Sequence, residues 1–223
     1  MLEIIHKLRV FVNENNKFGN HVGIIIDVEN NINKHKRQTI ATKLGFSESV
    51  FINKLNPASV SIFNPQREIS FVGHAMVGAA WFLKQFHNQK INFIDCAGGR
   101  IKTWEVNGFT WIQAGLSSMP PWQFEQLKDI VAVETFPTKK ALLKKHTFVW
   151  AWQDKNKGII RARTFAPDWG IPEDEANGSG AMKLSAKLRS KITVIHGQGS
   201  VIYANFAGAG LVEVGGRVAE LLV

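Results

Sequence analysis

A repeated segment constrains the fold of this chain more than any other sequence feature. The stretch IFNPQREISFVGHAMVGAAWFLKQ begins at Ile62, and TFAPDWGIPEDEANGSGAMKLSAKL begins at Thr164. In each copy a Phe-x-Pro triplet precedes a glycine and a polar residue, Gly73-His74 and Gly178-Ser179, where a stretch rich in small residues predicts a helix. Two halves facing each other would bring these helix starts together. Because helix starts present unpaired N–H groups and a positive dipole end, this arrangement predicts a pocket for a carboxylate.

The segments around the repeat predict mainly strands. Short runs of apolar and β-branched residues, bounded by Gly, Asn, Ser or Pro, predict strands at 4–12, 22–28, 49–53, 59–64, 91–96, 99–106, 109–116, 146–154, 158–165, 192–206 and 210–223. Further helices are predicted at 33–44, 123–133 and 138–145. This order predicts an α+β fold of two pseudo-symmetric halves, residues 1–115 and 116–223, each a β-barrel-like sheet around one central helix.

Composition excludes several classes of protein. No apolar run approaches the roughly 18 residues that a membrane-spanning helix needs. The first residues include Glu3 and interrupted apolar positions, unlike a secretory signal, so we expect a cytoplasmic protein. The single cysteine, Cys96, excludes an intramolecular disulfide. The histidines lack the spacing of a zinc site, so we expect no metal.

The net charge of +9 does not by itself indicate a nucleic-acid partner. The densest basic groups lie at 34–37 and 139–145, in polar or amphipathic stretches without interleaved aromatic residues. Such groups are typical of solvated surfaces, so we expect neither nucleic acid nor membrane as a partner.

Four polar residues are candidates for chemistry: Asn20, His74, Asp174 and Ser179. Each has an ordinary structural alternative, since Asn20 could form a turn, His74 could cap or pack, and the other two could begin a helix. Their placement at matching points of a repeat favours function instead. A histidine from one half and a carboxylate from the other form a workable acid–base pair beside a bound anion.

These residues also carry a resemblance to a known family. The motifs FGN, the SES of GFSESVFI, IFNP-x5-FVGHA, EDEANGSG and VEVGGRV occur in the order typical of the phenazine-biosynthesis isomerase (PhzF-like) family, and the resemblance covers nearly the whole chain. It implies the diaminopimelate epimerase fold, an active site in the cleft between the halves, and a homodimer. It also implies cofactor-independent isomerisation or epimerisation of a small carboxylated metabolite by proton transfer.

The resemblance assigns roles residue by residue. It places catalytic groups at His74 and Asp174, and substrate-binding groups at Ser179 and Asn20. Backbone N–H groups near Gly73 and Gly178 would receive the substrate carboxylate.

The chain departs from the family pattern at several positions. The proline of the family's GHP motif is replaced by Ala75, and the proline of its EDP motif is replaced by Glu175. The threonine of its ATGS motif is replaced by Asn177. The family's catalytic glutamate aligns with Lys43 of ATKLGFSES. Lys43 could be a solvent-facing residue in a protein that no longer catalyses, a cation for an anionic substrate, or a lysine base whose pKa is lowered by burial.

Two functions therefore compete at the level of sequence. The first is a PhzF-like isomerase or epimerase that moves a proton on a small amino- or hydroxy-carboxylate, with Asp174, His74 and Lys43 as catalytic residues. The alternative is a non-catalytic ligand-binding or interaction protein of the same fold that has lost its catalytic glutamate.

Overall fold

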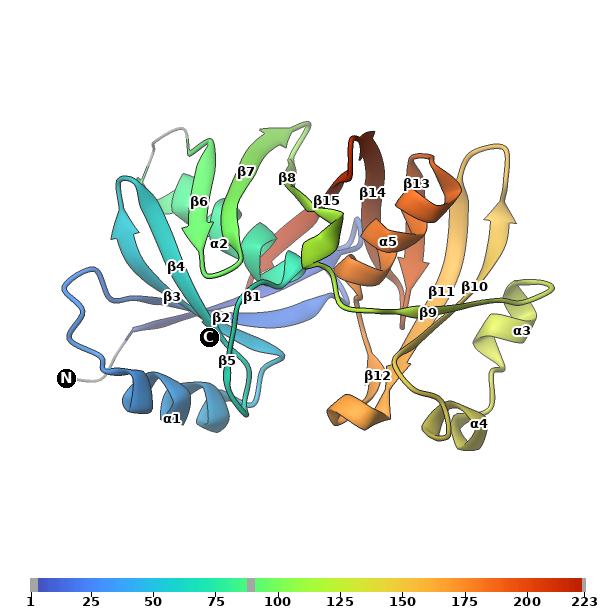
Figure 1. Ribbon diagram of the computed structural model, residues 1–223, viewed down its shortest axis with the longest axis horizontal. Coiled ribbons are helices and arrows are strands. Elements are labelled where there is room, and N and C mark those ends of the chain that lie inside the picture. The colour runs from blue at the N-terminus through green and yellow to red at the C-terminus, as the bar shows by residue number, and fades with distance from the viewer. Residues whose placement is uncertain (1–3, 88–90, 222–223) are drawn as a thin grey trace.

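The computed structural model describes residues 4–87 and 91–221 and has an α+β fold (Figure 1). Its strands are β1 (Ile5–Val12), β2 (Asn20–Ile26), β3 (Glu48–Leu55), β4 (Ala58–Phe63), β5 (Glu68–Ile69), β6 (Phe93–Cys96), β7 (Gly99–Val106), β8 (Phe109–Gly115), β9 (Gln123–Gln126), β10 (Thr147–Asp154), β11 (Ile159–Ala166), β12 (Ile171–Asp174), β13 (Ile192–His196), β14 (Ser200–Gly208) and β15 (Leu211–Glu220). The α-helices are α1 (Lys34–Leu44), α2 (Gly73–His87), α3 (Ile130–Glu134), α4 (Thr138–Leu142) and α5 (Gly178–Leu188), and short 3-10 turns lie at η1 (Leu116–Ser118) and η2 (Pro167–Trp169). None of the helices in the described ranges is long and apolar enough to cross a membrane.

The first half is a closed barrel around α2. Within the described residues eight strands close the ring in the order β1-β2-β3-β4-β6-β7-β8-β15, and β15 pairs with β1 to complete it. Ala75, Met76, Ala79 and Leu83 of α2 are fully buried or nearly so, in agreement with a helix that is apolar on most sides. The small residues of α2 let the strands approach closely, since a Cβ at Gly78 would lie 3.1 Å from Val10.

The second half continues the same sheet and packs on α5. From β15 the strand order runs β14-β13-β11-β10-β9, and β12 pairs with β11 (Figure 1). Helix α5 packs against β13, β14 and β15, and its residues Ala181, Met182 and Leu184 are buried. Gly180 is required for this packing because an added Cβ would lie 2.5 Å from the Phe148 ring. The predicted fold class of two halves, each with a central helix, is therefore confirmed.

The last strand links the two halves. Strand β15 pairs with β14 on one side and with β8 on the other, and it also pairs with β1. Its Val214 is matched to Ile112 of β8 and to Ala204 of β14. The C-terminal strand therefore supplies one wall of the first barrel. A division of the chain between residues 115 and 116 stays a prediction.

The expected helix over residues 123–133 was wrong in its first part. Residues 123–126 form β9, which runs parallel to β10 with Phe124 matched to Phe148. The two rings lie 5.6 Å apart, so burial of Phe124 against the neighbouring strand favours the extended conformation over a helix. The helix begins only at Ile130, where the Asp129 side chain accepts a hydrogen bond from the N–H of Ala132.

Candidate active site

A cavity of about 890 Å³ lies where the two copies of the repeat meet. Its walls come from both halves, and its lining combines residues of the first copy with residues of the second and of the segment that precedes β9. Its lining includes the polar, aromatic and glycine residues Glu48, Gly73, His74, Trp122, Asp168, Trp169, Asp174, Asn177, Gly178 and Ser179.

The two helix starts converge at this cavity, as the repeat predicted. Helix α2 begins at Gly73 and α5 begins at Gly178, and a Cβ placed on Gly73 would lie 4.0 Å from the backbone nitrogen of Ser179. Asn177 caps α5 by accepting a hydrogen bond from the N–H of Gly180 at 2.8 Å. The first N–H groups of both helices and the positive ends of both dipoles therefore point to one region, which suits an anion.

A buried ion pair lies beside these helix starts. Glu48 is the first residue of β3, and its Oε2 contacts Nε2 of His74. Both side chains are largely buried, at 12% and 7% exposure. Burial is the largest influence on the pKa of His74 and lowers it, but the charge and hydrogen bond of Glu48 and the charge of Asp174 together raise the pKa above its ordinary value. The neighbouring carboxylate therefore favours the protonated form of His74.

Asp174 faces the cavity from the second half and is fixed by two donors. Its Oδ1 accepts hydrogen bonds from Nδ2 of Asn20 at 2.8 Å and from the N–H of Ala176 at 3.1 Å. Asn20 is 5% exposed and is not among the lining residues, and its amide also donates to the Ala176 carbonyl at 3.1 Å. The sequence proposed Asn20 as a substrate-binding residue, whereas the structure uses its amide to hold Asp174.

Lys43 does not lie in the cavity, which corrects the expectation that it belongs to the site. It is an exposed residue in the last turn of α1, and α1 ends at Gly45 in a left-handed cap. The chain then enters β3 at Glu48, five residues after Lys43 in the sequence, and Glu48 does line the cavity. Glu48 belongs to the SES motif, whereas the sequence pattern had placed the candidate position at the end of the preceding helix.

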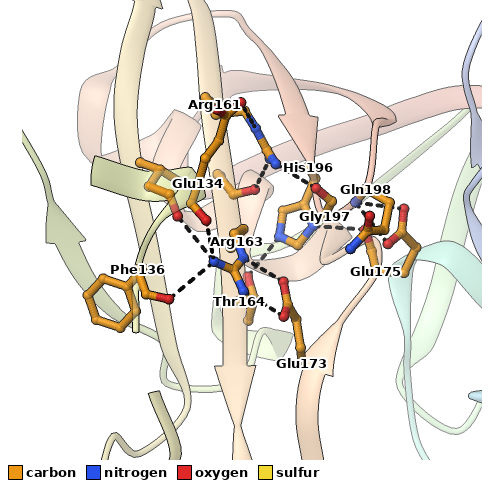
Figure 2. Close-up of polar contacts among 12 residues, drawn as sticks. Glu134, Phe136, Arg161, Arg163, Thr164, Glu173, Glu175, His196, Gly197 and Gln198 are labelled. Carbon is orange, nitrogen blue, oxygen red and sulfur yellow. Dashed lines mark hydrogen bonds and ion pairs between the residues drawn. The ribbon is translucent and has the colours of Figure 1, made fainter. Parts of the chain in front are cut away.

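A polar network holds in place the loop of residues 175–177, which joins β12 to α5 in the second copy of the repeat (Figure 2). His196 is fully buried, and its Nδ1 donates to the Glu175 carbonyl at 2.9 Å, while its Nε2 accepts from Oγ1 of Thr164 at 2.8 Å. The carbonyl can only accept, so the proton of the neutral imidazole lies on Nδ1. The Glu175 carboxylate in turn accepts from Oγ of Ser200 at 2.7 Å. Glu175, which departs from the family pattern, therefore fixes the loop beside Asp174.

Arg163 anchors the strand that precedes this loop. Its guanidinium forms two hydrogen bonds with Glu173, at 2.7 and 2.8 Å, as Figure 2 shows. The same group donates to the carbonyls of Glu134 and Phe136 at and after the end of α3. A cation at a helix C-terminus satisfies carbonyls that lack intrahelical partners, so Arg163 ties α3 to β12, the strand that ends at Asp174.

Comparisons with known proteins agree with this geometry. The family model described as Phenazine biosynthesis-like protein matches residues 8–110. The trans-2,3-dihydro-3-hydroxyanthranilate isomerase of Pseudomonas aeruginosa is 26% identical over 259 residues, which cover 89% of this chain and 90% of that protein. The chain therefore resembles the PhzF-like family.

Solved structures show the same fold. A PhzF-family protein of Enterococcus faecalis superimposes on the PhzF-like chain with a TM-score of 0.80 at 17% identity, and each chain is covered completely. A hydroxyproline epimerase of Agrobacterium vitis, solved with bound trans-4-hydroxy-L-proline, gives a TM-score of 0.60 at 11% identity and covers 98% of this chain and 90% of that one. The PhzF-like chain therefore has the diaminopimelate epimerase-like fold.

Proposed function

We propose that this protein is an isomerase or epimerase that moves a proton on a small amino- or hydroxy-carboxylate in the cavity between its halves. The observation that carries the proposal is the placement of Glu48 against His74 beside the two converging helix starts. The named activities of relatives support the same reaction class, since they are isomerases and epimerases. The proposed reaction uses side chains alone, and cytoplasmic location and homodimerisation stay expectations from the resemblance.

The helix starts at Gly73 and Gly178 would bind the substrate carboxylate. Removing a proton from the adjacent carbon places negative charge on that carboxylate. Backbone N–H groups fixed by the helices would stabilise this charge without having to reorganise during the reaction. The cavity surface is contributed by both halves, so substrate binding would remove the reacting carbon from water.

Acid–base groups face the cavity from both halves. Glu48, with His74 beside it, would exchange a proton with the substrate carbon from the first half. Asp174, held by Asn20, would do so from the second half. Two such groups on different walls allow a proton to be removed at one position and returned at another, which is the chemistry of an isomerase or an epimerase.

The competing function, a binding protein without a catalytic glutamate, rested on Lys43. Lys43 is exposed on α1, and a glutamate is present in the cavity. The presence of this glutamate supports catalysis over the binding-only alternative.

Proton NMR in deuterated water tests the proposal. The unaltered protein is incubated with trans-2,3-dihydro-3-hydroxyanthranilate and with a panel of small amino- and hydroxy-carboxylates, and Asp174→Asn is run in parallel. We expect deuterium to enter a carbon–hydrogen position of one of these compounds, and we expect the rate to fall roughly 100-fold or more in the variant, as for loss of an acid–base group. Saturable binding without exchange across the whole panel would contradict the proposal.

A further inference from the structure

An indole nitrogen is bonded to the serine at the start of α5. Nε1 of Trp122 lies 2.8 Å from Oγ of Ser179, and both residues line the cavity. Trp122 comes from the segment between η1 and β9, outside both copies of the repeat. This contact is a feature that only the three-dimensional structure shows.

The direction of each hydrogen bond in this cluster follows from chemistry. Indole N–H can only donate, so the Ser179 oxygen accepts from Trp122. The Ser179 hydroxyl then donates its own proton to Oδ1 of Asn177, 3.1 Å away. The same Asn177 oxygen accepts from the N–H of Gly180 at 2.8 Å. The cluster is therefore a directed chain from Trp122 through Ser179 to Asn177.

We propose that Trp122 is a positioning residue that prepares Ser179 to donate a hydrogen bond to the substrate carboxylate. This inference rests on the proposed function, which places that carboxylate at the helix starts. When the carboxylate binds, the Ser179 proton turns from Asn177 to the ligand, while the indole N–H stays on the Ser179 oxygen. Donation to the oxygen polarises the hydroxyl and strengthens it as a donor.

The exchange keeps a donor on each of the two oxygen atoms of this cluster. After the Ser179 proton turns away, Oδ1 of Asn177 still accepts from the N–H of Gly180, so the helix cap is kept. The Ser179 oxygen still accepts from Trp122. The binding step therefore avoids the penalty of leaving either oxygen atom without a donor.

The indole is held in place before any ligand arrives. Its ring lies 5.0 Å from the Trp169 ring at 61°, and Trp169 stacks on His146 at 4.6 Å and 11°. Asp168 fixes His146 through a 2.9 Å bond to Nδ1 and accepts from its backbone N–H at 2.9 Å. These contacts restrict the Trp122 ring without using its N–H group, which remains directed at Ser179.

A double-mutant cycle tests the role of the N–H group. Trp122→Phe keeps an aromatic ring and removes the donor, Ser179→Ala removes the hydroxyl, and Trp104→Phe is the matched control because Trp104 of β7 does not line the cavity. Binding of anthranilate, which carries an amino group and a carboxylate, is measured by calorimetry beside its uncharged carboxamide analogue, 2-aminobenzamide. Thermal unfolding of every variant shows whether it is folded.

We expect Trp122→Phe to weaken anthranilate binding roughly threefold to tenfold, the range for one hydrogen bond, with a smaller effect on 2-aminobenzamide. In the Ser179→Ala background the Trp122 substitution should add no further loss, because the indole acts through the hydroxyl. Trp104→Phe should bind like the unaltered protein. The indole N–H resonance that Trp122→Phe removes should shift when anthranilate is added.

Three results would overturn this role for Trp122. They are unchanged binding in Trp122→Phe, losses that add in the double variant, and absence of any anthranilate binding to the unaltered protein. The cycle measures binding alone, so it is separable from the exchange experiment. Coupled binding losses in a protein that shows no deuterium exchange would support the role of Trp122 and contradict only the proposed catalysis.

Discussion

Nδ2 of Asn20 lies 2.8 Å from Oδ1 of Asp174, and this bond joins β2 of the first half to the end of β12 in the second. The same amide donates to the Ala176 carbonyl at 3.1 Å, so one buried side chain fixes both the carboxylate and its backbone. The relationship explains how a group from one copy of the repeat keeps its position relative to His74 in the other copy.

Replacing Asn20 should therefore impair catalysis more than binding. In Asn20→Ala, Asp174 keeps only the N–H of Ala176 as a donor, and its carboxylate can turn away from the cavity. We expect kcat to fall roughly 10- to 100-fold, because a misplaced catalytic group costs about that much, while KM changes little. Steady-state kinetics on the substrate found by the exchange assay measure both constants. A rise in KM with unchanged kcat would instead support the direct substrate contact that the sequence suggested.

The pair of His74 and Glu48 predicts a loss of stability in alkali. Because the folded-state pKa of His74 is raised above its ordinary value, its contribution is complete below about pH 6.5 and is lost as the pH rises through the raised value. Urea unfolding across this range should show the loss in the unaltered protein, and His74→Gln should remove it. Equal pH dependence in the two proteins would show that the pair does not contribute in this way.

His196 predicts the opposite dependence in acid. Burial is the largest influence on its pKa and lowers it, outweighing the attraction of Asp174 and its bond to Glu175. As the pH falls below about 6.5, the His196 side chain takes up a proton in the unfolded chain but stays neutral in the folded chain. The free energy of unfolding therefore decreases. His196→Gln cannot titrate, and its amide can still donate to one partner and accept from the other. We expect the free energy of unfolding of this variant, measured with urea, to fall less steeply at acid pH than that of the unaltered protein. An equally steep fall in both proteins would contradict the assignment.

The sequence predicted the parts of the fold that follow from local pattern and repetition. The helix starts at Gly73 and Gly178 were found because a glycine and a polar residue precede a run of small residues in both copies. That they converge followed from the two-fold repeat. Strand β9 was missed because QFEQ is short, and its extended form depends on pairing with β10, which lies more than twenty residues away.

The site was predicted in part for a related reason. His74 and Asp174 were found through the repeat, but Lys43 and Glu48 lie only five residues apart on either side of a helix end. Which of them faces the cavity depends on the turn at Gly45 and on the pairing of β3 with β2, and the local sequence does not encode that choice. Trp122 had no pattern that could reveal it, because its contact with Ser179 spans 57 residues.

We propose that Glu48, and not Lys43, transfers the proton. The most direct measurement is the rate of deuterium incorporation into the substrate by the unaltered protein, Glu48→Gln and Lys43→Gln, with thermal unfolding to show that each is folded. We expect a loss of roughly 100-fold or more in Glu48→Gln and a rate within about twofold in Lys43→Gln. Retained exchange in Glu48→Gln together with a large loss in Lys43→Gln would contradict the account.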